Sequence, residues 1–250
     1  MPSHLPIGLI GGIGLTEVHV YAHRPGPDGK FGGCPHIHAV VDEAYYVLRG
    51  SGQVEFHDPT HGFRTLKLTP GVYAHFPPRI MHRLVSDGDL VILGMMGSAG
   101  LAEQGEARIY FGPEVDASPD QFNRLRSLPQ TLGLEGALQR RDAAISAYQK
   151  LLHLHDTDSA AYFAELRRFT QVHCQAMAPL TAAFREKVIT GPLAWTNLTL
   201  TRLNQLTQPD HPAPPPIMTN HPSETAFGMC GVLRPMLHLH SLQDIAIQQP

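Results

Sequence analysis

Cysteine, tryptophan and charged residues are all scarce in this sequence. Its three cysteines, Cys34, Cys174 and Cys230, stand far apart without a CxxC pair, so neither a disulfide framework nor a zinc ribbon is indicated. A formal net charge of −3 gives no electrostatic reason to expect a nucleic-acid partner. No apolar run is long enough for a bilayer span, and the first residues lack a basic segment and a cleavage site. We therefore expect a cytoplasmic protein that binds neither nucleic acid nor membrane.

Histidine, by contrast, is abundant, with 16 residues among 250, and this directs attention to metal chemistry. Hydrophobic residues make up 42% of the chain and charged residues 16%, which favours a packed globular protein over a disordered chain. The length allows one large domain, or a core domain with a substantial appendage.

The first half of the chain is patterned as short strands separated by glycine- and proline-rich turns. The turn at 49–52 is short enough to predict a hairpin between the strands on either side of it. The expected strands are 16–21, 43–48, 53–57, 63–68, 72–76, 82–85 and 90–93. Many short strands at regular spacing favour an antiparallel β-barrel or sandwich, which we expect to occupy residues 1–112.

After Gly112 the pattern becomes helical. Ser118 is a plausible N-cap, followed by Pro119 at the first helical position and Gln121 three residues on. Helical spacing covers 134–154, 160–176 and 180–189, with a kink or end expected at Pro179 and an end at Gly191-Pro192. Residues 193–206 fit either period, and 209–222 are rich in proline. We expect residues 113–250 to be a helical extension whose β-like tail, 232–247, could return to the barrel.

Two short stretches within the strands could supply metal ligands. His36 and His38 are two apart, so they project from the same face of a strand. Glu43 lies an odd number of residues further on, so a bend or bulge must bring it to that face. In the second stretch Gly71 begins a turn, Pro77 makes another, and His82 opens the next strand. If that strand pairs beside the first motif, His82 becomes the fourth ligand.

These two stretches resemble the paired motifs of the cupin superfamily, H-x-H-x4-E-x6-G and G-x5-P-x-G-x2-H-x3-N. The first matches from His36 to Gly50 at every named position, and Gly71, Pro77 and His82 match the second. Arg79 replaces the second motif's internal glycine, and Ser86 replaces its asparagine. The resemblance covers about residues 15–112 and implies a jelly-roll β-barrel of the cupin type. It also implies one metal bound by His36, His38, Glu43 and His82.

Three imidazoles and one carboxylate suit a divalent transition metal, with Fe(II) favoured and Mn, Ni, Cu or Zn also possible. Four protein ligands leave two positions open on an octahedral ion. Glu43 could remain a ligand or act as a general base. Tyr45 shares its side of the strand and could position a substrate oxygen, or simply pack in the core. Arg79 could clamp a substrate carboxylate at the rim, although a solvated arginine is the commoner case.

Other histidines and cysteines are less suited to the site. Cys34 is interpreted as structural, and His75 alternates away from the inward residues of its strand. His153 and His155 diverge on a predicted helix. His238-Leu-His240 with Asp244 repeats the first motif only superficially, and we interpret it as a closing strand.

The leading functional hypothesis is a metal-dependent dioxygenase acting on a small oxygen-bearing organic substrate, as a homodimer. This hypothesis rests on the cupin resemblance alone. Because one fold serves many reactions, the resemblance does not select the reaction. A non-redox isomerase, decarboxylase or lyase would use the same metal as a Lewis acid. A third hypothesis is a non-catalytic sensor of small molecules. Against a nucleic-acid-binding sensor, residues 114–208 carry ten Lys/Arg and nine Asp/Glu, without a basic cluster.

Overall fold

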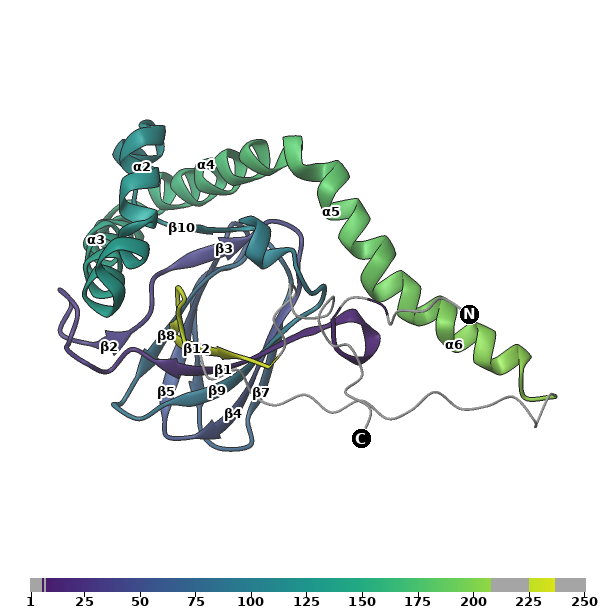
Figure 1. Cartoon of the computed structure of the whole chain (residues 1–250). Coiled ribbons are helices and arrows are strands. Elements are labelled where there is room, and N and C mark those ends of the chain that lie inside the picture. Colours follow the sequence, from purple (N-terminus) through teal and green to yellow (C-terminus); the bar gives the residue numbers. More distant parts are fainter. Residues whose placement is uncertain (1–5, 7, 208–224, 237–250) are drawn as a thin grey trace.

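Two antiparallel sheets face each other and form the body of the molecule, with helices along one side (Figure 1). The computed structural model describes residue 6, residues 8–207 and residues 225–236. The first sheet has the order β11 (Ala226–Phe227), β12 (Gly231–Pro235), β1 (Gly14–Val20), β9 (Val91–Met96), β4 (Glu43–Arg49) and β7 (Tyr73–Phe76). The second has the order β10 (Ala107–Ile109), β3 (His36–His38), β8 (Met81–Ser86), β5 (Gly52–Asp58) and β6 (Gly62–Leu68), with β2 (Phe31–Gly32) paired to β8.

The core between the sheets is built by period-two alternation in the strands. Inward side chains of both sheets, such as Val47 and Ile92 from the first and Val54 and Leu84 from the second, belong to one buried cluster. All seven expected strands are present, and the predicted antiparallel arrangement is confirmed.

The chain after residue 112 is mostly helical, as predicted. Its helical elements are α1 (Pro113–Asp116), α2 (Pro119–Arg126), α3 (Leu128–Thr157), α4 (Ser159–Met177), η3 (Ala178–Leu180), α5 (Thr181–Val188), η4 (Ile189–Leu193) and α6 (Ala194–Asn204). The side chain of Ser118 accepts a hydrogen bond from the backbone N–H of Gln121, which confirms the predicted cap. At Pro179 the helix narrows to the 3-10 turn η3, so the predicted kink is also confirmed.

One predicted helix end is wrong. The chain does not stop at Gly191-Pro192 but passes through the π-helical turn η4 and continues as α6. The wider turn accommodates a proline that lacks a backbone N–H, so the helical path survives. The ambiguous segment 193–206 is therefore helical over most of its length.

Helices α3 and α4 cover the outer face of the second sheet. Ile37 and Met81 point outward from β3 and β8 and pack against Tyr148, Leu166 and Phe169 of these helices. Because side chains alternate along a strand, the outward turn of Ile37 leaves its neighbours His36 and His38 facing the interior.

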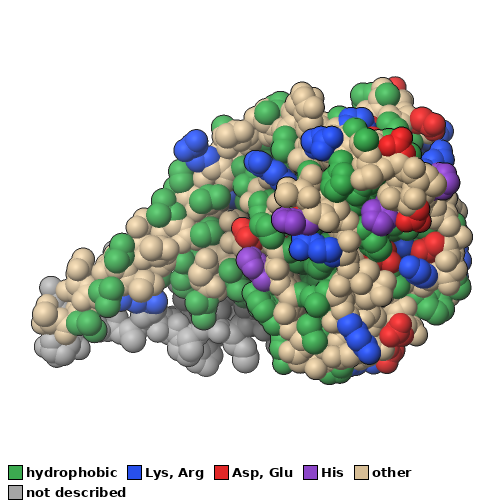
Figure 2. Space-filling view, turned by 180° about the vertical axis from the view of Figure 1, so that it is seen from behind, with side chains coloured by type: hydrophobic (Ala, Val, Ile, Leu, Met, Phe, Trp, Pro, Cys, Tyr) green, Lys and Arg blue, Asp and Glu red, His purple; other side chains and the backbone are tan. Residues whose placement is uncertain are grey.

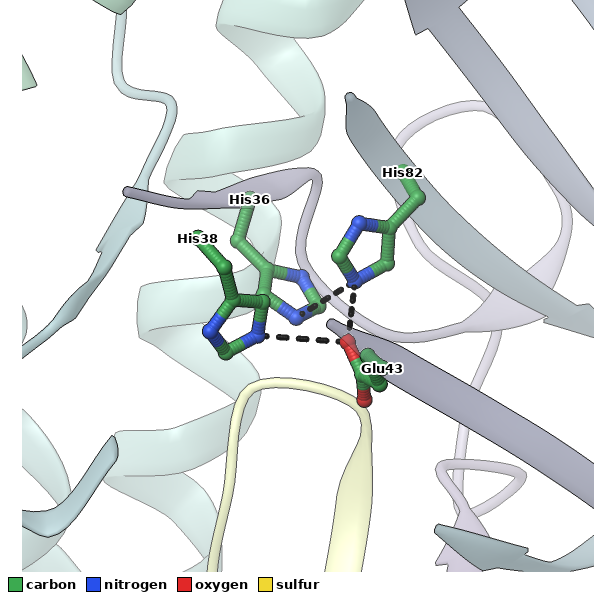
Figure 3. A group of neighbouring side chains, drawn as sticks. All are labelled: His36, His38, Glu43 and His82. Atoms are coloured by element: carbon green, nitrogen blue, oxygen red, sulfur yellow. Dashed lines mark hydrogen bonds and ion pairs between the residues drawn. The ribbon is translucent and has the colours of Figure 1, made fainter. Parts of the chain in front are cut away.

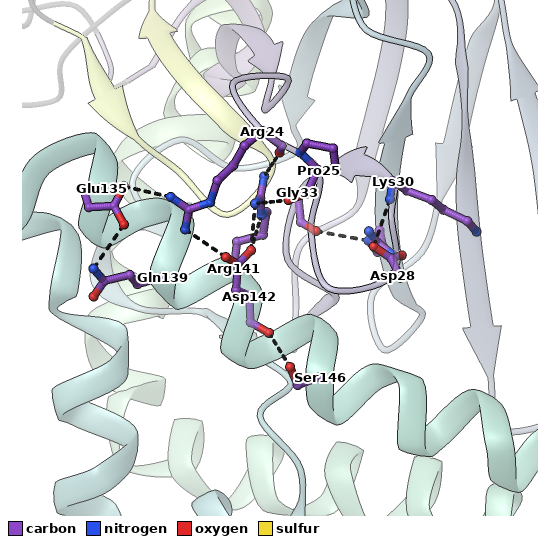
Figure 4. Close-up of polar contacts among 11 residues, drawn as sticks. Arg24, Pro25, Asp28, Lys30, Gly33, Glu135, Gln139, Arg141, Asp142 and Ser146 are labelled. Carbon is purple, nitrogen blue, oxygen red and sulfur yellow. Dashed lines mark hydrogen bonds and ion pairs between the residues drawn. The ribbon is translucent and has the colours of Figure 1, made fainter.

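A buried arginine joins α3 to the loop between β1 and β2 (Figure 4). Arg141 is fully buried and donates hydrogen bonds to the carbonyl oxygens of Arg24 and Pro25 and to the carboxylate of Asp142. Arg24 in turn pairs with Glu135 at 2.8 Å and with Asp142 at 2.9 Å. Backbone carbonyls that a loop would otherwise expose are thus satisfied by the helix.

The C-terminal hairpin β11–β12 returns to the barrel, and β12 pairs antiparallel with β1. Residues 232–235 of the predicted tail therefore lie in the first sheet, whereas His238, His240 and Asp244 lie outside the described residues. The division at residue 112 stays a prediction, because this hairpin belongs structurally with the strands of residues 1–112.

An arm formed by α5, η4 and α6 projects from the body (Figures 1 and 2). It rests on η1 (Ile10–Gly12), where a Cβ added to Gly12 would lie 2.4 Å from the backbone nitrogen of Pro192. Several apolar side chains of the arm are exposed, namely Ile189, Leu193, Leu200 and Leu203. Within the described part of the chain, none of the helices combines the length and apolar character needed to cross a membrane.

Candidate metal centre

The four predicted ligands meet between the two sheets. His36 and His38 lie on β3, and His36 is directly opposite His82 of β8. Glu43 begins β4 in the other sheet, and residues 39–42 form the bend that carries the chain across. The bend required by the odd spacing of Glu43 is thus present.

The side chains converge closely (Figure 3). One ligand atom from each residue lies within 4.8 Å of the other three. His36 Nε2 and His82 Nε2 are 3.0 Å apart, and Glu43 Oε2 lies 3.2 Å from His38 Nε2 and 3.0 Å from His82 Nε2. The residues are between 1% and 7% exposed, so little water reaches them.

Each imidazole is oriented through its Nδ1 atom. His36 Nδ1 donates to the carbonyl of Cys34 at 2.9 Å, and His82 Nδ1 donates to the carbonyl of Ile80 at 3.1 Å. His38 Nδ1 donates to the carboxylate of Glu106 at 2.6 Å. A proton held on Nδ1 leaves Nε2 with a lone pair, the usual arrangement of a histidine that binds a metal.

This arrangement fits a divalent cation. With the proton on Nδ1, the neighbouring Nε2 atoms of His36 and His82 present two lone pairs to each other. Glu43 Oε2 is buried and accepts no well-formed hydrogen bond from the described residues. Buried lone pairs and carboxylate oxygens without donors are costly, and a positive ion bound among them removes that cost.

The charges of these groups are strongly coupled. Burial and neighbouring His82 lower the pKa of His36. Burial also disfavours charge on His38, but Glu43 and Glu106 outweigh it and raise the His38 pKa to about 10. Burial would raise the pKa of Glu43, yet His82 and His38 hold it well below its usual range. Binding of a cation would displace the proton from His38 Nε2, since a ligand nitrogen must be unprotonated.

Aromatic rings and one thiol surround the ligands. The ring centroid of Phe76 lies 4.6 Å from that of His82, and Tyr45 is 1% exposed with its ring 6.2 Å from His82. Cys230, from the turn between β11 and β12, places its Sγ 3.7 Å from His36 Nε2 and 3.9 Å from the hydroxyl of Tyr45. Tyr45 thus faces the same interior as Glu43, and its predicted role in substrate binding stays a prediction.

Arg79 lies elsewhere. It is exposed and borders a shallow cleft on the outer side of the second sheet, together with Ile37, Met81 and Phe169. None of the four ligands lines that cleft. The predicted carboxylate clamp therefore stays a prediction, and the side chain of Arg79 has no described contact with the four ligands.

Two other histidines among the described residues lie apart from the cluster. His75 is half exposed and pairs with Asp42, and His155 pairs with Asp156 on the surface of α3. Cys34 is fully buried, and its backbone carbonyl orients His36.

Two residues near the ligands have no signal in the sequence. Glu106 and Cys230 are respectively 68 and 194 residues from the histidines they contact, and neither belongs to a motif. Only the fold brings them to the site.

Comparison with known proteins identifies part of the chain. Residues 24–95 match the family model described as a cupin domain. No curated protein matches. Solved structures that resemble the chain include KdgF from Halomonas sp., at 23% identity, covering 38% of this chain and 71% of that one with a TM-score of 0.28.

Two further solved structures show a likeness of similar extent. WlaRA, a TDP-fucose-3,4-ketoisomerase from Campylobacter jejuni, is 12% identical, covering 36% of this chain and 64% of that one, with a TM-score of 0.30. A cupin protein from Bacteroides fragilis is 20% identical, covering 36% of this chain and 68% of that one, with a TM-score of 0.27. The family match, the paired antiparallel sheets and the motif residues agree: residues 24–95 of the chain form a domain of the cupin superfamily.

Proposed function

We propose that this protein is a metal-dependent enzyme that binds one divalent transition metal through His36, His38, Glu43 and His82. The observation that carries the proposal is the common orientation of the three imidazole rings. Each is held by an oxygen acceptor at Nδ1, and each directs Nε2 towards the carboxylate of Glu43 or towards another ligand. A histidine cluster that served packing alone would not need all three rings in this orientation.

Within this class we favour an Fe(II)-dependent dioxygenase acting on a small oxygen-bearing organic substrate. Imidazole and carboxylate donors suit iron, and four protein ligands leave two positions on an octahedral ion. A metal bound there would supply either Lewis-acid or oxygen-binding chemistry. The surrounding Tyr45, Phe76 and Cys230 keep the site dry, which protects reactive species from water.

The chain itself would contribute two groups to the reaction. Burial raises the pKa of the Tyr45 phenol well above its ordinary value, as do the neighbouring Cys230 and Glu43. Tyr45 would therefore keep its proton and act as a hydrogen-bond donor to a substrate oxygen. Glu43, if released from the metal, could accept a proton.

The first test is elemental analysis of the purified protein by inductively coupled plasma mass spectrometry. We expect near-stoichiometric iron, manganese, nickel, copper or zinc in the wild type, and loss of the metal in the His36→Ala/His82→Ala double variant. His75→Ala, which removes a histidine outside the cluster, is the matched control and should retain the metal. Absence of metal from the wild type, even after reconstitution, would refute the proposal.

The dioxygenase assignment has its own test. The Fe(II)-loaded protein should bind nitric oxide at the metal and give the electron paramagnetic resonance signal of an iron–nitrosyl centre. A reconstituted Fe(II) protein that never gives this signal would exclude oxygen binding and leave the non-redox alternative.

That alternative is an isomerase, decarboxylase or lyase. The carboxylate of Glu43 and the phenol of Tyr45 favour it. These two residues are two apart in the sequence and lie on the same side of β4. Turnover of a substrate under strictly anaerobic conditions would support it over the dioxygenase. The sensor hypothesis, the homodimer and the absence of nucleic-acid or membrane partners stay predictions.

A further inference from the structure

We propose that Glu106 is the residue that determines which ring nitrogen of His38 is available to a metal. The inference rests on the metal site proposed above and concerns a positioning residue, because Glu106 touches a ligand and not the ion. It lies immediately before β10, whose residue Ala107 pairs with His38. The side chain of Glu106 is fully buried.

The carboxylate of Glu106 is held in one orientation by three donors. Its Oε2 accepts from His38 Nδ1 at 2.6 Å. Its Oε1 accepts from the backbone N–H groups of Val40 at 2.5 Å and Val41 at 3.0 Å. The backbone of Glu106 is anchored as well, because its carbonyl accepts from His173 on α4 at 2.7 Å.

His38 differs from the other two histidines in how its tautomer is set. His36 and His82 donate to backbone carbonyls two residues before them. A backbone carbonyl remains an acceptor whatever side chain its residue carries. His38 depends on a side chain. A carboxylate oxygen accepts from the ring, so Nδ1 carries a proton and Nε2 is the nitrogen from which a metal can displace the other proton.

Replacement of Glu106 by glutamine would reverse this arrangement. The amide has one oxygen and one NH₂ group, and two backbone N–H donors face the Oε1 position. With the oxygen there, both of these hydrogen bonds are kept and the NH₂ group faces His38 Nδ1. Nδ1 must then accept, Nε2 takes the proton and donates to Glu43, and the lone pair needed by the metal is lost. The opposite amide orientation would leave two buried N–H groups facing an NH₂ group, which is unfavourable.

Glutamine and aspartate variants separate this role from simple packing. Glutamine has nearly the shape of glutamate, whereas aspartate is one methylene shorter and leaves a gap. A structural role therefore predicts that Glu106→Asp is the more harmful change. The tautomer role predicts the reverse, because aspartate is still only an acceptor and never forces Nδ1 to give up its proton.

Affinity for Co(II) alone, measured by competition with a chromophoric chelator, gives the first test. Loss of a residue that hydrogen-bonds to a metal ligand typically weakens metal binding about 10–100-fold. We expect Glu106→Gln to weaken Co(II) binding about 100-fold or more, and Glu106→Asp to weaken it less than about tenfold. Glu55→Gln, the same change at another buried carboxylate, is the matched control and should bind Co(II) as the wild type does. Equal losses in the two Glu106 variants, or a larger loss with aspartate, would overturn the proposal.

A second measurement does not require metal. In ¹⁵N-labelled metal-free protein, the Nδ1–H signal of His38 should be present in the wild type and in Glu106→Asp, and missing in Glu106→Gln. Assignment follows from the ring signals lost in His38→Gln. If the wild type binds no Co(II) yet shows this pattern, the metal proposal fails while the role of Glu106 stands. If Glu106→Gln keeps the Nδ1–H signal, the role of Glu106 fails.

Discussion

The backbone at Arg79 has the left-handed conformation that glycine favours, with φ 69°. This is the position at which the cupin motif has glycine, so the turn geometry is retained although the residue differs. The N–H of Arg79 donates to the carbonyl of His38 at 2.8 Å and ties the turn to the ligand strand. Ser86, which stands in place of the motif's asparagine, accepts hydrogen bonds from the N–H groups of Gly88 and Leu90.

Glycine and alanine variants at Arg79 should therefore differ in stability in the opposite sense to the usual one. At an ordinary position alanine is more stable than glycine, by about 0.5–1 kcal/mol. Here we expect Arg79→Gly to be more stable than Arg79→Ala by about 1 kcal/mol, because a left-handed residue with a Cβ carries strain of about 1–2 kcal/mol. Urea unfolding of the metal-free proteins measures the difference. If Arg79→Ala were instead the more stable variant, the turn would be unstrained.

At this scale the metal ligands were predictable, and the residues that hydrogen-bond to them were not. The shared face of His36 and His38 follows from alternation, which is a local property, and the resemblance to the cupin motifs implied Glu43 and His82 as the other two ligands. Glu106 was not predictable, because a pairing between β10 and β3 brings it to His38, and a strand of three residues has no detectable period. The position of Arg79 could be placed in a turn, but the face on which its side chain lies depends on the packing of α4.

Among the elements, α3 and α4 are both attached to the second sheet through His57 of β5. Tyr162 of α4 lies 2.7 Å from His57 Nδ1, and Tyr148 of α3 lies 2.6 Å from Nε2. Because the Tyr148 hydroxyl donates to Glu55, it accepts from His57 Nε2–H, and Tyr162 donates to Nδ1. Burial, with a smaller contribution from His155, lowers the pKa of His57 to about 3.

The stability of the protein should consequently fall as the pH decreases from about 6.5. The unfolded chain takes up a proton on His57 near its ordinary pKa of 6.5, while the folded protein does not until about pH 3. Between pH 7 and 4 this single group should lower the free energy of unfolding by about 3 kcal/mol. Chemical unfolding across this range should show a smaller loss in His57→Gln than in the wild type. His61→Gln, at an exposed position of the next turn, is the control and should follow the wild type; equal slopes in all three would contradict the prediction.

The contact between η1 and the arm provides a matched pair of glycines. Gly11 and Gly12 both have positive φ, of 81° and 77°. A Cβ on Gly12 would meet the backbone of Pro192, whereas one on Gly11 has nothing within 4 Å. We expect Gly12→Ala to be less stable than Gly11→Ala by about 1–3 kcal/mol, the usual cost of overpacking. Thermal unfolding and limited proteolysis within α6 would measure it, and equal stability of the two variants would show that the arm does not hold this contact.

Strands and long helices were predictable because their periodicity runs for many residues. The short strands β2 and β10 were not, since they consist of two and three residues and exist only through their partners. The continuation through Gly191-Pro192 was missed for a related reason. A proline normally ends a helix, and only the π-helical turn at this place allows the chain to proceed.

At the scale of the whole molecule, the ligand set bridges the two sheets. Three histidines belong to β3 and β8 of the second sheet, and the carboxylate belongs to β4 of the first. A single ion bound by all four would link the sheets through bonds that the unfolded chain cannot form together. Metal binding and folding should therefore be coupled.

Metal should raise the unfolding temperature, and chelation should lower it. A ligand at 100 times its dissociation constant stabilises the folded state by about 2.7 kcal/mol when the unfolded state does not bind it. For a chain of this length that corresponds to a rise of roughly 5–10 °C. Differential scanning calorimetry with Co(II) and then with excess EDTA measures the effect. The unfolding temperature of His82→Ala should hardly change with Co(II), because this variant has lost a ligand from one of the bridged sheets. An equal rise in His82→Ala would place the metal elsewhere, on surface histidines, and would separate metal binding from the linkage between the sheets.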